Sequence, residues 1–398
     1  MKALLIIACI LVIIGSALLI VTVCSDGFGS GSMLCGNFEE RTVDLTEEFV
    51  GVEILSDTAN VSLFPSESAD CKVVYNDNKK INYSIAVEDG ILKIKTVDTR
   101  AWFERIFSFS FKEASLTVYL PQNDYTSLLI DESTGDVFIH SCFKFNTIDV
   151  KVSTGDVMSS AAGAEHIKIQ GGTGDVTLDG VNAGSLDVEI STGCIRLNSV
   201  VASGDVNVKV STGDILISNM GCNNFTSHGD TGNILIDRAN VSGNAAVERS
   251  TGDVIINGTV CSGNISTVTT TGKTELNGIT CECDINIAIS TGKCGLFDVT
   301  CAGLTTTGDT GSIIMSNVIA NGNLSIERGT GDVTFDACDA SVVKIVTDTG
   351  DVEGSLLTDK IFSTKTSTGK IDIPESNGDG RCNVETSTGN IKIEIETH

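Results

Sequence analysis

Seven aspartates in this sequence follow a Thr-Gly dipeptide, and they are spaced by 19 or 20 residues or a multiple of that interval: Asp136, Asp156, Asp175, Asp214, Asp253, Asp332 and Asp351. Carboxylate oxygens are the ligands that Ca²⁺ prefers. A column of stacked aspartates is therefore a candidate cation site, with Asp136, Asp156 and Asp175 as its first members. Stacked carboxylates also repel one another, by about 1 kcal/mol per pair in water. We favour a solvated acidic edge that deters edge pairing, with a Ca²⁺ ladder as the alternative.

Cysteine is the second residue type that could do chemistry, with 14 copies. Four of them occupy one place, nine residues after a repeated glycine: Cys222, Cys261, Cys281 and Cys301. Most other repeats place alanine or valine there, so this place is predicted to be a small buried apolar slot. Parallel stacking suits a disulfide poorly, so we expect buried free thiols. The Cys-x-Cys pair at 281 and 283 has no neighbouring histidine, which argues against zinc.

Catalytic motifs are missing from the sequence. Its four histidines show no metal-ligand spacing, and no Gly-x-Ser-x-Gly occurs. Residues 269–274 imitate the end of a phosphate-binding loop, but Thr267 stands where that loop needs glycine. Carbohydrate-active β-helices remain an alternative, yet they build a cleft from long loops, and the constant repeat spacing leaves no room for one. We expect a protein that is not an enzyme and has no cofactor except, as the alternative, Ca²⁺.

The spacing of the Thr-Gly dipeptide defines the architecture. Its 14 glycines lie between Gly135 and Gly389 in steps of 19 or 20 residues. Such regularity indicates one structural unit stacked on itself. A longer period is also present, because residues 225–254 match residues 304–333 at an offset of 79 residues, which is four units. A tandem duplication of four units explains this match.

Each unit reads as short strands joined at a glycine corner. Before the glycine, apolar residues alternate with polar ones, as at Ile148 and Val150, and the alternation resumes after it, as at Ile215 and Ile217. A tight corner needs a residue with positive φ, which glycine provides. Because the inward positions keep their register, we predict an all-β, single-stranded parallel β-solenoid (a β-helix), which we expect to be right-handed, rather than antiparallel hairpins.

The N-terminal third is organised differently. Residues 3–23 form an apolar run long enough to cross a membrane. We predict one transmembrane helix within an anchor at residues 1–24, with a cytoplasmic N-terminus and the solenoid outside, so the cell membrane is the expected location. A cleaved signal peptide and a lipoprotein are the alternatives. Residues 25–37 are expected to be a flexible linker, 38–130 irregular β-rich capping coils, and 131–398 the regular repeats.

An aromatic segment at residues 100–111 stands out in the lead-in. It contains Trp102, Phe103 and Phe107. A capping role at the end of the solenoid is the interpretation we favour, and an interfacial or partner-binding patch is the alternative. The net charge of −26 argues against nucleic acid as a partner. The oligomeric state is not predicted.

The sequence resembles a known family. It combines a short membrane segment, a lead-in that ends in LTVYLPQNDYTSLLIDESTGDV at 116–137, and tandem Ser-Thr-Gly-Asp repeats. These features are similar to those of the bacterial putative-adhesin family of β-strand-repeat proteins, a family of undefined function. The resemblance covers most of residues 38–398 and implies a surface-exposed β-solenoid, with no catalytic residues to transfer. The high cysteine content departs from it.

Two functions follow as expectations. The first is a membrane-anchored, non-enzymatic rod that acts as an adhesin or interacts with the cell envelope through an unknown ligand. The second is an envelope scaffold or sensor partner that binds another membrane or envelope protein through the aromatic segment. A Ca²⁺-dependent glycan-binding or glycan-active β-helix comes third.

Overall fold

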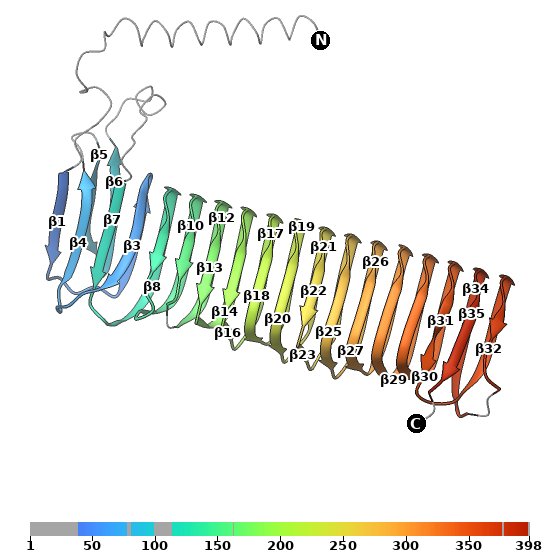
Figure 1. Cartoon of the computed structure of the whole chain (residues 1–398). Coiled ribbons are helices and arrows are strands. Elements are labelled where there is room, and N and C mark those ends of the chain that lie inside the picture. Colours follow the sequence, from blue (N-terminus) through green and yellow to red (C-terminus); the bar gives the residue numbers. More distant parts are fainter. Residues whose placement is uncertain (1–38, 78–80, 99–113, 162, 376–377, 397–398) are drawn as a thin grey trace, which may run out of the picture.

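The computed structural model describes residues 39–77, 81–98, 114–161, 163–375 and 378–396. These residues form a long rod of stacked β-coils with no helix among them (Figure 1). The all-β solenoid predicted from the Thr-Gly spacing is confirmed. The predicted transmembrane helix at residues 3–23 lies outside the described residues, and no helix within them is long and apolar enough to cross a membrane.

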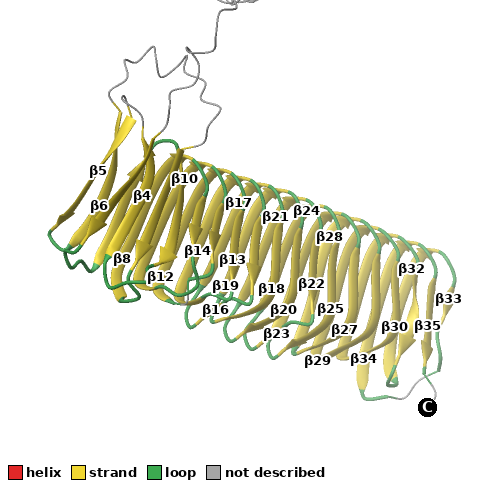
Figure 2. Cartoon of the chain, turned by 60° about the vertical axis from the view of Figure 1, so that its left-hand side comes forward, coloured by secondary structure: helices red, strands yellow, loops and turns green. Residues whose placement is uncertain are grey.

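Two faces of the rod are built from the strands on either side of each Thr-Gly corner (Figure 2). The entry sheet holds the strands that lead into the corners, in spatial order β5 (Ile81–Glu88), β6 (Ile91–Asp98), β2 (Gly51–Ser56), β8 (Asp124–Thr134), β10 (Lys144–Thr154), β12 (Ala164–Thr173), β14 (Asn182–Thr192), β17 (Val206–Thr212), β19 (Phe225–Thr231), β21 (Ala245–Thr251), β24 (Ile265–Thr271), β26 (Asp284–Thr291), β28 (Gly303–Thr310), the second halves of β29 (Ile313–Thr330) and β30 (Val333–Thr349), β34 (Gly380–Thr388) and β32 (Lys360–Thr368).

The exit sheet holds the strands that leave the corners, in spatial order β1 (Glu39–Leu45), β4 (Cys71–Asp77), β7 (Ala114–Leu120), β3 (Ala59–Pro65), β9 (Val137–Ile139), β11 (Val157–Ser159), β13 (Val176–Asp179), β15 (Ile195–Asn198), β18 (Ile215–Cys222), β20 (Ile234–Val241), β22 (Val254–Asn257), β25 (Thr274–Cys281), β27 (Cys294–Cys301), the first halves of β29 and β30, β31 (Val352–Leu356), β35 (Ile391–Ile395) and β33 (Ile371–Asp372). Two short strands, β16 (Val201–Ala202) and β23 (Val260–Cys261), lie on the remaining side.

Neighbouring coils pair in parallel and in register, so one repeat position forms one column along the rod. Val188, for example, pairs with Ile169 on one side and Val208 on the other. The corners stack in the same way, because the N–H of each corner glycine donates to the threonine carbonyl of the next coil, as from Gly174 to Thr192 at 3.0 Å. Thirteen of the corner glycines have φ between 122° and 155°.

The interior of the rod is a continuous apolar core. The inward positions of both sheets are filled by valine, isoleucine and leucine side chains that are almost completely buried. The small slot nine residues after the corner is buried as predicted, and it holds the four cysteines that the sequence placed there: Cys222, Cys261, Cys281 and Cys301. All cysteines of the described ranges are free.

The N-terminal end is closed by a change of strand direction. β2 and β3 form the first coil, because β8 and β9 stack on them in parallel. On the outer side of this coil, β6 pairs in parallel with β2, and β7 pairs in parallel with β3. The strands beyond them are antiparallel: β5 pairs with β6, β4 with β7, and β1 with β4. The regular stacking therefore includes residues 51–65, and the antiparallel strands cap it.

At the C-terminal end the coils do not stack in sequence order. Stacking in sequence order would place β32 on β30, but β34 lies between them and pairs in parallel with both (Figure 1). The inward residues of the two strands are similar. β34 places Cys382, Val384 and Thr386 in the columns where β32 places Phe362, Thr364 and Thr366. These side chains give no structural reason for the exchange.

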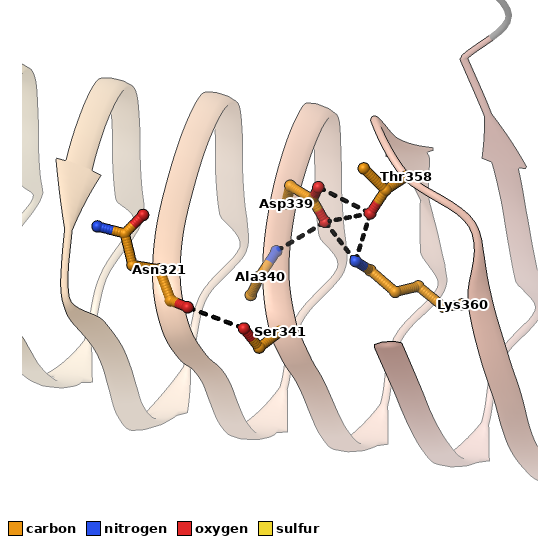
Figure 3. A network of polar contacts seen from close by, with 6 residues as sticks. All are labelled: Asn321, Asp339, Ala340, Ser341, Thr358 and Lys360. Carbon is orange, nitrogen blue, oxygen red and sulfur yellow. Dashed lines mark hydrogen bonds and ion pairs between the residues drawn. The ribbon is translucent and has the colours of Figure 1, made fainter. Parts of the chain in front are cut away.

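A polar network fixes the crossing that this exchange requires (Figure 3). The side chain of Lys360 is 5% exposed, and its Nζ lies 2.6 Å from Oδ1 of Asp339. Thr358 donates to the same carboxylate and accepts from Lys360. Gly380 leaves the space for the lysine stem, because a Cβ there would lie 2.6 Å from its Cδ. The connection to β32 is thus held to a coil two places away.

Candidate functional site

The corner aspartates bind backbone rather than facing open solvent alone. Oδ1 of Asp136 accepts the N–H of Asp156 at 2.8 Å, and Oδ1 of Asp156 accepts that of Asp175 at 2.8 Å. Asp175 accepts the N–H of Cys194 and forms an ion pair with Arg196 at 2.7 Å. The hydrogen bond from Arg196 and then that from the backbone hold the pKa of the Asp175 carboxyl below its ordinary value.

Asparagine plays the same part in other coils. Asn60 accepts the N–H of Asp136, Asn233 accepts that of Asp253, and Asn390 accepts that of Lys370. A neutral amide therefore satisfies the position, and the shared requirement is an oxygen for a backbone donor of the adjacent coil. Over the described ranges, no group of three or more His, Cys, Asp or Glu side chains is arranged to hold a metal ion. The Ca²⁺ ladder stays a prediction.

The aromatic segment at residues 100–111, for which a capping role was favoured and partner binding was the alternative, cannot be placed. Trp102, Phe103 and Phe107 lie outside the described residues, between β6 and β7 of the cap. A different aromatic cluster, which the sequence analysis missed, lies on the exit sheet beside the cap. The rings of Phe64 and Phe138 are 5.3 Å apart, and Tyr119 lies 6.2 Å from Phe64. These residues are distant in sequence, so only the pairing of β3 with β7 and β9 reveals the cluster.

A shallow depression on the outward face of the entry sheet is a candidate binding surface. It crosses the four neighbouring strands β12, β14, β17 and β19, and eleven residues line it: Lys168, Ile169, Gln170, Asp187, Val188, Glu189, Asn207, Val208, Lys209, Thr226 and His228. The polar ones occupy the two outward positions of each strand. In-register stacking therefore brings them together from residues almost 20 apart.

Pairs of opposite character connect the coils across this depression. Lys209 Nζ donates to Glu189 Oε1 at 2.7 Å, and Asn207 Nδ2 donates to Asp187 Oδ1 at 2.8 Å. The hydrogen bond to Glu189 raises the pKa of the exposed Lys209 ammonium. Lys168 is exposed and has no ion-pair partner in the described part of the chain. The surface offers donors and acceptors at a regular interval, which suits a polar ligand. The available signal in the sequence was that Glu189 and Lys209, which carry opposite charges, occupy the same repeat position in consecutive coils.

One buried carboxyl belongs to the first corner. Glu132 is completely buried, and its Oε1 accepts the N–H groups of Ala59 at 3.2 Å and Thr134 at 3.1 Å. Burial raises the pKa of this carboxyl from 4.5 to about 7, against the opposing effect of its hydrogen bonds. The first coil has no Thr-Gly corner. At its bend, the Glu132 carboxylate accepts the backbone N–H of Ala59. Its role is structural.

The free energy of unfolding is expected to fall between pH 4.5 and pH 7 because of Glu132. The folded protein binds this proton more tightly than the unfolded chain, so the stabilisation is complete below pH 4.5 and is lost as the pH rises through 7. Glu132→Gln imitates the protonated form and should remove that fall, leaving the variant more stable by about 3 kcal/mol at pH 8. Urea unfolding at a series of pH values measures the difference. Glu165→Gln, at an exposed position, is the control, and a pH-independent difference for Glu132→Gln would contradict the assignment.

Comparison with known proteins adds a family match. The model of the family described as Toastrack DUF4097 matches residues 51–287, which is more than half of the chain. No curated protein matches the sequence.

Several solved structures are similar over most of their length. One is a putative cell adhesion protein from Clostridium sporogenes, with 10% identity and a TM-score of 0.20, covering 90% of this chain and 100% of that chain. Another is a putative adhesin from Parabacteroides distasonis, with 12% identity and a TM-score of 0.23, covering 89% and 99%. A third is a putative lipid binding protein from the same organism, with 14% identity and a TM-score of 0.21, covering 91% and 99%.

Proposed function

Because this chain belongs to the Toastrack DUF4097 family, we propose that it is a non-enzymatic rod that is held at the cell membrane by residues 3–23 and binds a ligand outside the cell, as an adhesin does. The family is one of unknown function, so the proposal rests on the surface of the rod. The observation that carries it is the depression between β12 and β19, whose outward side chains are all polar.

The regular coils support binding over catalysis. Between Gly135 and Gly389 every Thr-Gly step is 19 or 20 residues, so no inserted loop forms walls around a substrate. The depression presents paired charges from successive coils, which lie about 4.8 Å apart. A ligand with repeated polar groups can bind several coils at once, and multivalent binding of this kind gains affinity without a deep pocket.

The depression can be tested by reversing one of its ion pairs. Cells that display the full chain should bind immobilised polysaccharides or immobilised envelope proteins about tenfold less well after the double change Glu189→Lys and Lys209→Glu, which keeps the pair but reverses its polarity. The matched control is Glu327→Lys with Lys344→Glu, a pair with the same 2.7 Å distance and similar exposure outside the depression. Unchanged binding, or an equal loss in both variants, would exclude the depression as the binding surface.

Placement at the cell surface has its own test. A protease added to intact cells should digest the coils if residues 3–23 anchor the chain with the solenoid outside. Protection of the coils until the cells are broken would contradict the surface rod, whatever the binding assay gives.

A further inference from the structure

Two arginines are buried inside the solenoid, among aliphatic side chains. Arg249 and Arg328 are only 2% and 4% exposed. Both lie three residues before a corner glycine, at an inward position that other coils fill with valine, isoleucine, threonine, glycine or, at residue 132, glutamate. Across the described residues, none of the three guanidinium nitrogens of Arg249 has a hydrogen-bond partner. Arg328 donates from Nη1 to the carbonyl of Ile289 at 2.9 Å, while its Nε and Nη2 have no partner.

The preceding coil makes room for each guanidinium. Gly229 pairs with Arg249, and Gly308 pairs with Arg328. A Cβ atom at either glycine would overlap with Nη1 of the arginine beside it. Each arginine thus reaches across the strand of the preceding coil into a space that only a glycine leaves open.

The pairing of a glycine with a buried arginine in the next coil occurs twice in the chain. The two Gly–Arg pairs are related by the 79-residue offset, and 16 of the 30 positions differ between residues 225–254 and 304–333. An inward hydroxyl also recurs two residues before each glycine, at Ser227 and Thr306, and both are buried without a hydrogen-bond partner. In the coil that follows Arg249, the hydroxyl of Thr267 is also buried without a hydrogen-bond partner.

Among the residues that the structure describes, no anionic side chain neutralises either cation inside the core. An arginine keeps its proton in proteins, and a buried charge is costly unless it is paired. Burial lowers the pKa of both guanidinium groups, and the nearest carboxylates acting against this belong to Asp214 and Asp230 for Arg249 and to Asp309 for Arg328. Those three are not buried side chains. Cys294 lies near Arg328, but burial raises the pKa of its thiol to about 12, so it is uncharged at neutral pH.

We propose that each arginine binds one small monovalent anion of the size of chloride within the solenoid. The unpartnered guanidinium nitrogens would donate to it, joined by the hydroxyl of Ser227 at the first site and of Thr306 at the second. Two polar sites in an otherwise apolar interior then become electrically neutral, and donors of these four side chains that have no partner gain an acceptor.

The number of anions can be read from stability measurements on the full chain in detergent. Above the dissociation constant, the free energy of unfolding rises with the logarithm of chloride concentration in proportion to the number of sites. Ionic strength is kept constant by replacing chloride with gluconate. For the wild type, the slope of the free energy of unfolding against the logarithm of chloride concentration should correspond to two sites. Arg249→Met and Arg328→Met should each give one, and the double variant none. The control Arg196→Met, at an exposed arginine, should keep two.

Two results would overturn the proposal. One is a wild-type midpoint that does not change when gluconate is exchanged for chloride, and the other is a slope that the two methionine variants leave unaltered. Methionine fills the buried space without a charge, so in gluconate these variants should be at least as stable as the wild type. Crystals grown in bromide give a test that needs no variant, because anomalous peaks are expected beside both guanidinium groups. Their absence at both would contradict the anion sites.

Discussion

Gly252→Ala is expected to lower the free energy of unfolding by about 4 kcal/mol. Gly252 has φ of 134°, which alanine rarely adopts, and a Cβ there would overlap with the carbonyl group of Gly232 in the preceding coil. Both obstacles are backbone, so no side-chain rearrangement relieves them. The stack can accept the methyl group only by separating two coils that are joined along both sheets.

Denaturant unfolding of the full chain, followed by far-UV circular dichroism, measures this effect. Gly221→Ala is the matched control, because its φ lies outside the positive region and the nearest atom to a new Cβ is Cγ1 of Val201, at 3.9 Å. We expect a change of no more than about 1 kcal/mol there. Equal losses in the two variants would show that any glycine-to-alanine change disturbs the rod and that the corner geometry has no special role.

Val384→Asp is expected to release two coils rather than one. Val384 is 1% exposed and lies between Ile345 of β30 and Thr364 of β32. A carboxylate in this position is buried without a partner, at a cost on the order of 4 kcal/mol, so β34 should detach. Because β32 pairs only with β34 among the strands of the entry sheet, it should detach as well.

Hydrogen exchange followed by mass spectrometry distinguishes the two possible orders of the coils. In Val384→Asp, the amides of both β32 and β34 should lose protection. The matched variant Thr364→Asp puts the same charge at the half-buried equivalent position of the outermost coil, and only β32 should lose protection. If β32 stays protected in Val384→Asp, the coils stack in sequence order and the exchange is wrong.

Much of the fold was predictable because one local requirement repeats. A Thr-Gly corner every 19 or 20 residues, alternating apolar positions and the small slot around Cys261 are each visible within a single repeat. Stacking in register then follows from burying the same face of every strand. The period of the sequence therefore specified the solenoid without any knowledge of distant contacts.

The parts that sequence analysis missed depend on contacts between distant segments. The order of β34 and β32 was hidden because both carry the same repeat and place similar residues in the same columns. Asp136 and Asp156 are exposed, as a solvated edge requires, but the backbone donor of the next coil, such as the N–H of Asp175, is not visible in a pattern of side chains. Asparagine at the same position, as at Asn233, was the available signal.

The interior arginines were missed for a similar reason. Arg249 falls at a position whose alternation predicts an inward side chain, but arginine is rarely buried, and the space left by Gly229 appears only when the two coils are superposed in register. The 79-residue repeat was the usable clue, because it preserves the glycine and the arginine together.

The exchanged order of the last two coils also affects how the rod ends. A stack of parallel strands finishes in an open row of backbone donors and acceptors, which is a template for joining further chains into fibres. Here the strand left at that edge is β32, whose inward residues include Thr364 and Thr366 and whose outward residues include Lys365. Polar and charged side chains in the second half of the outermost strand oppose end-to-end polymerisation. The outermost strand of the described stack thus itself limits growth at this end.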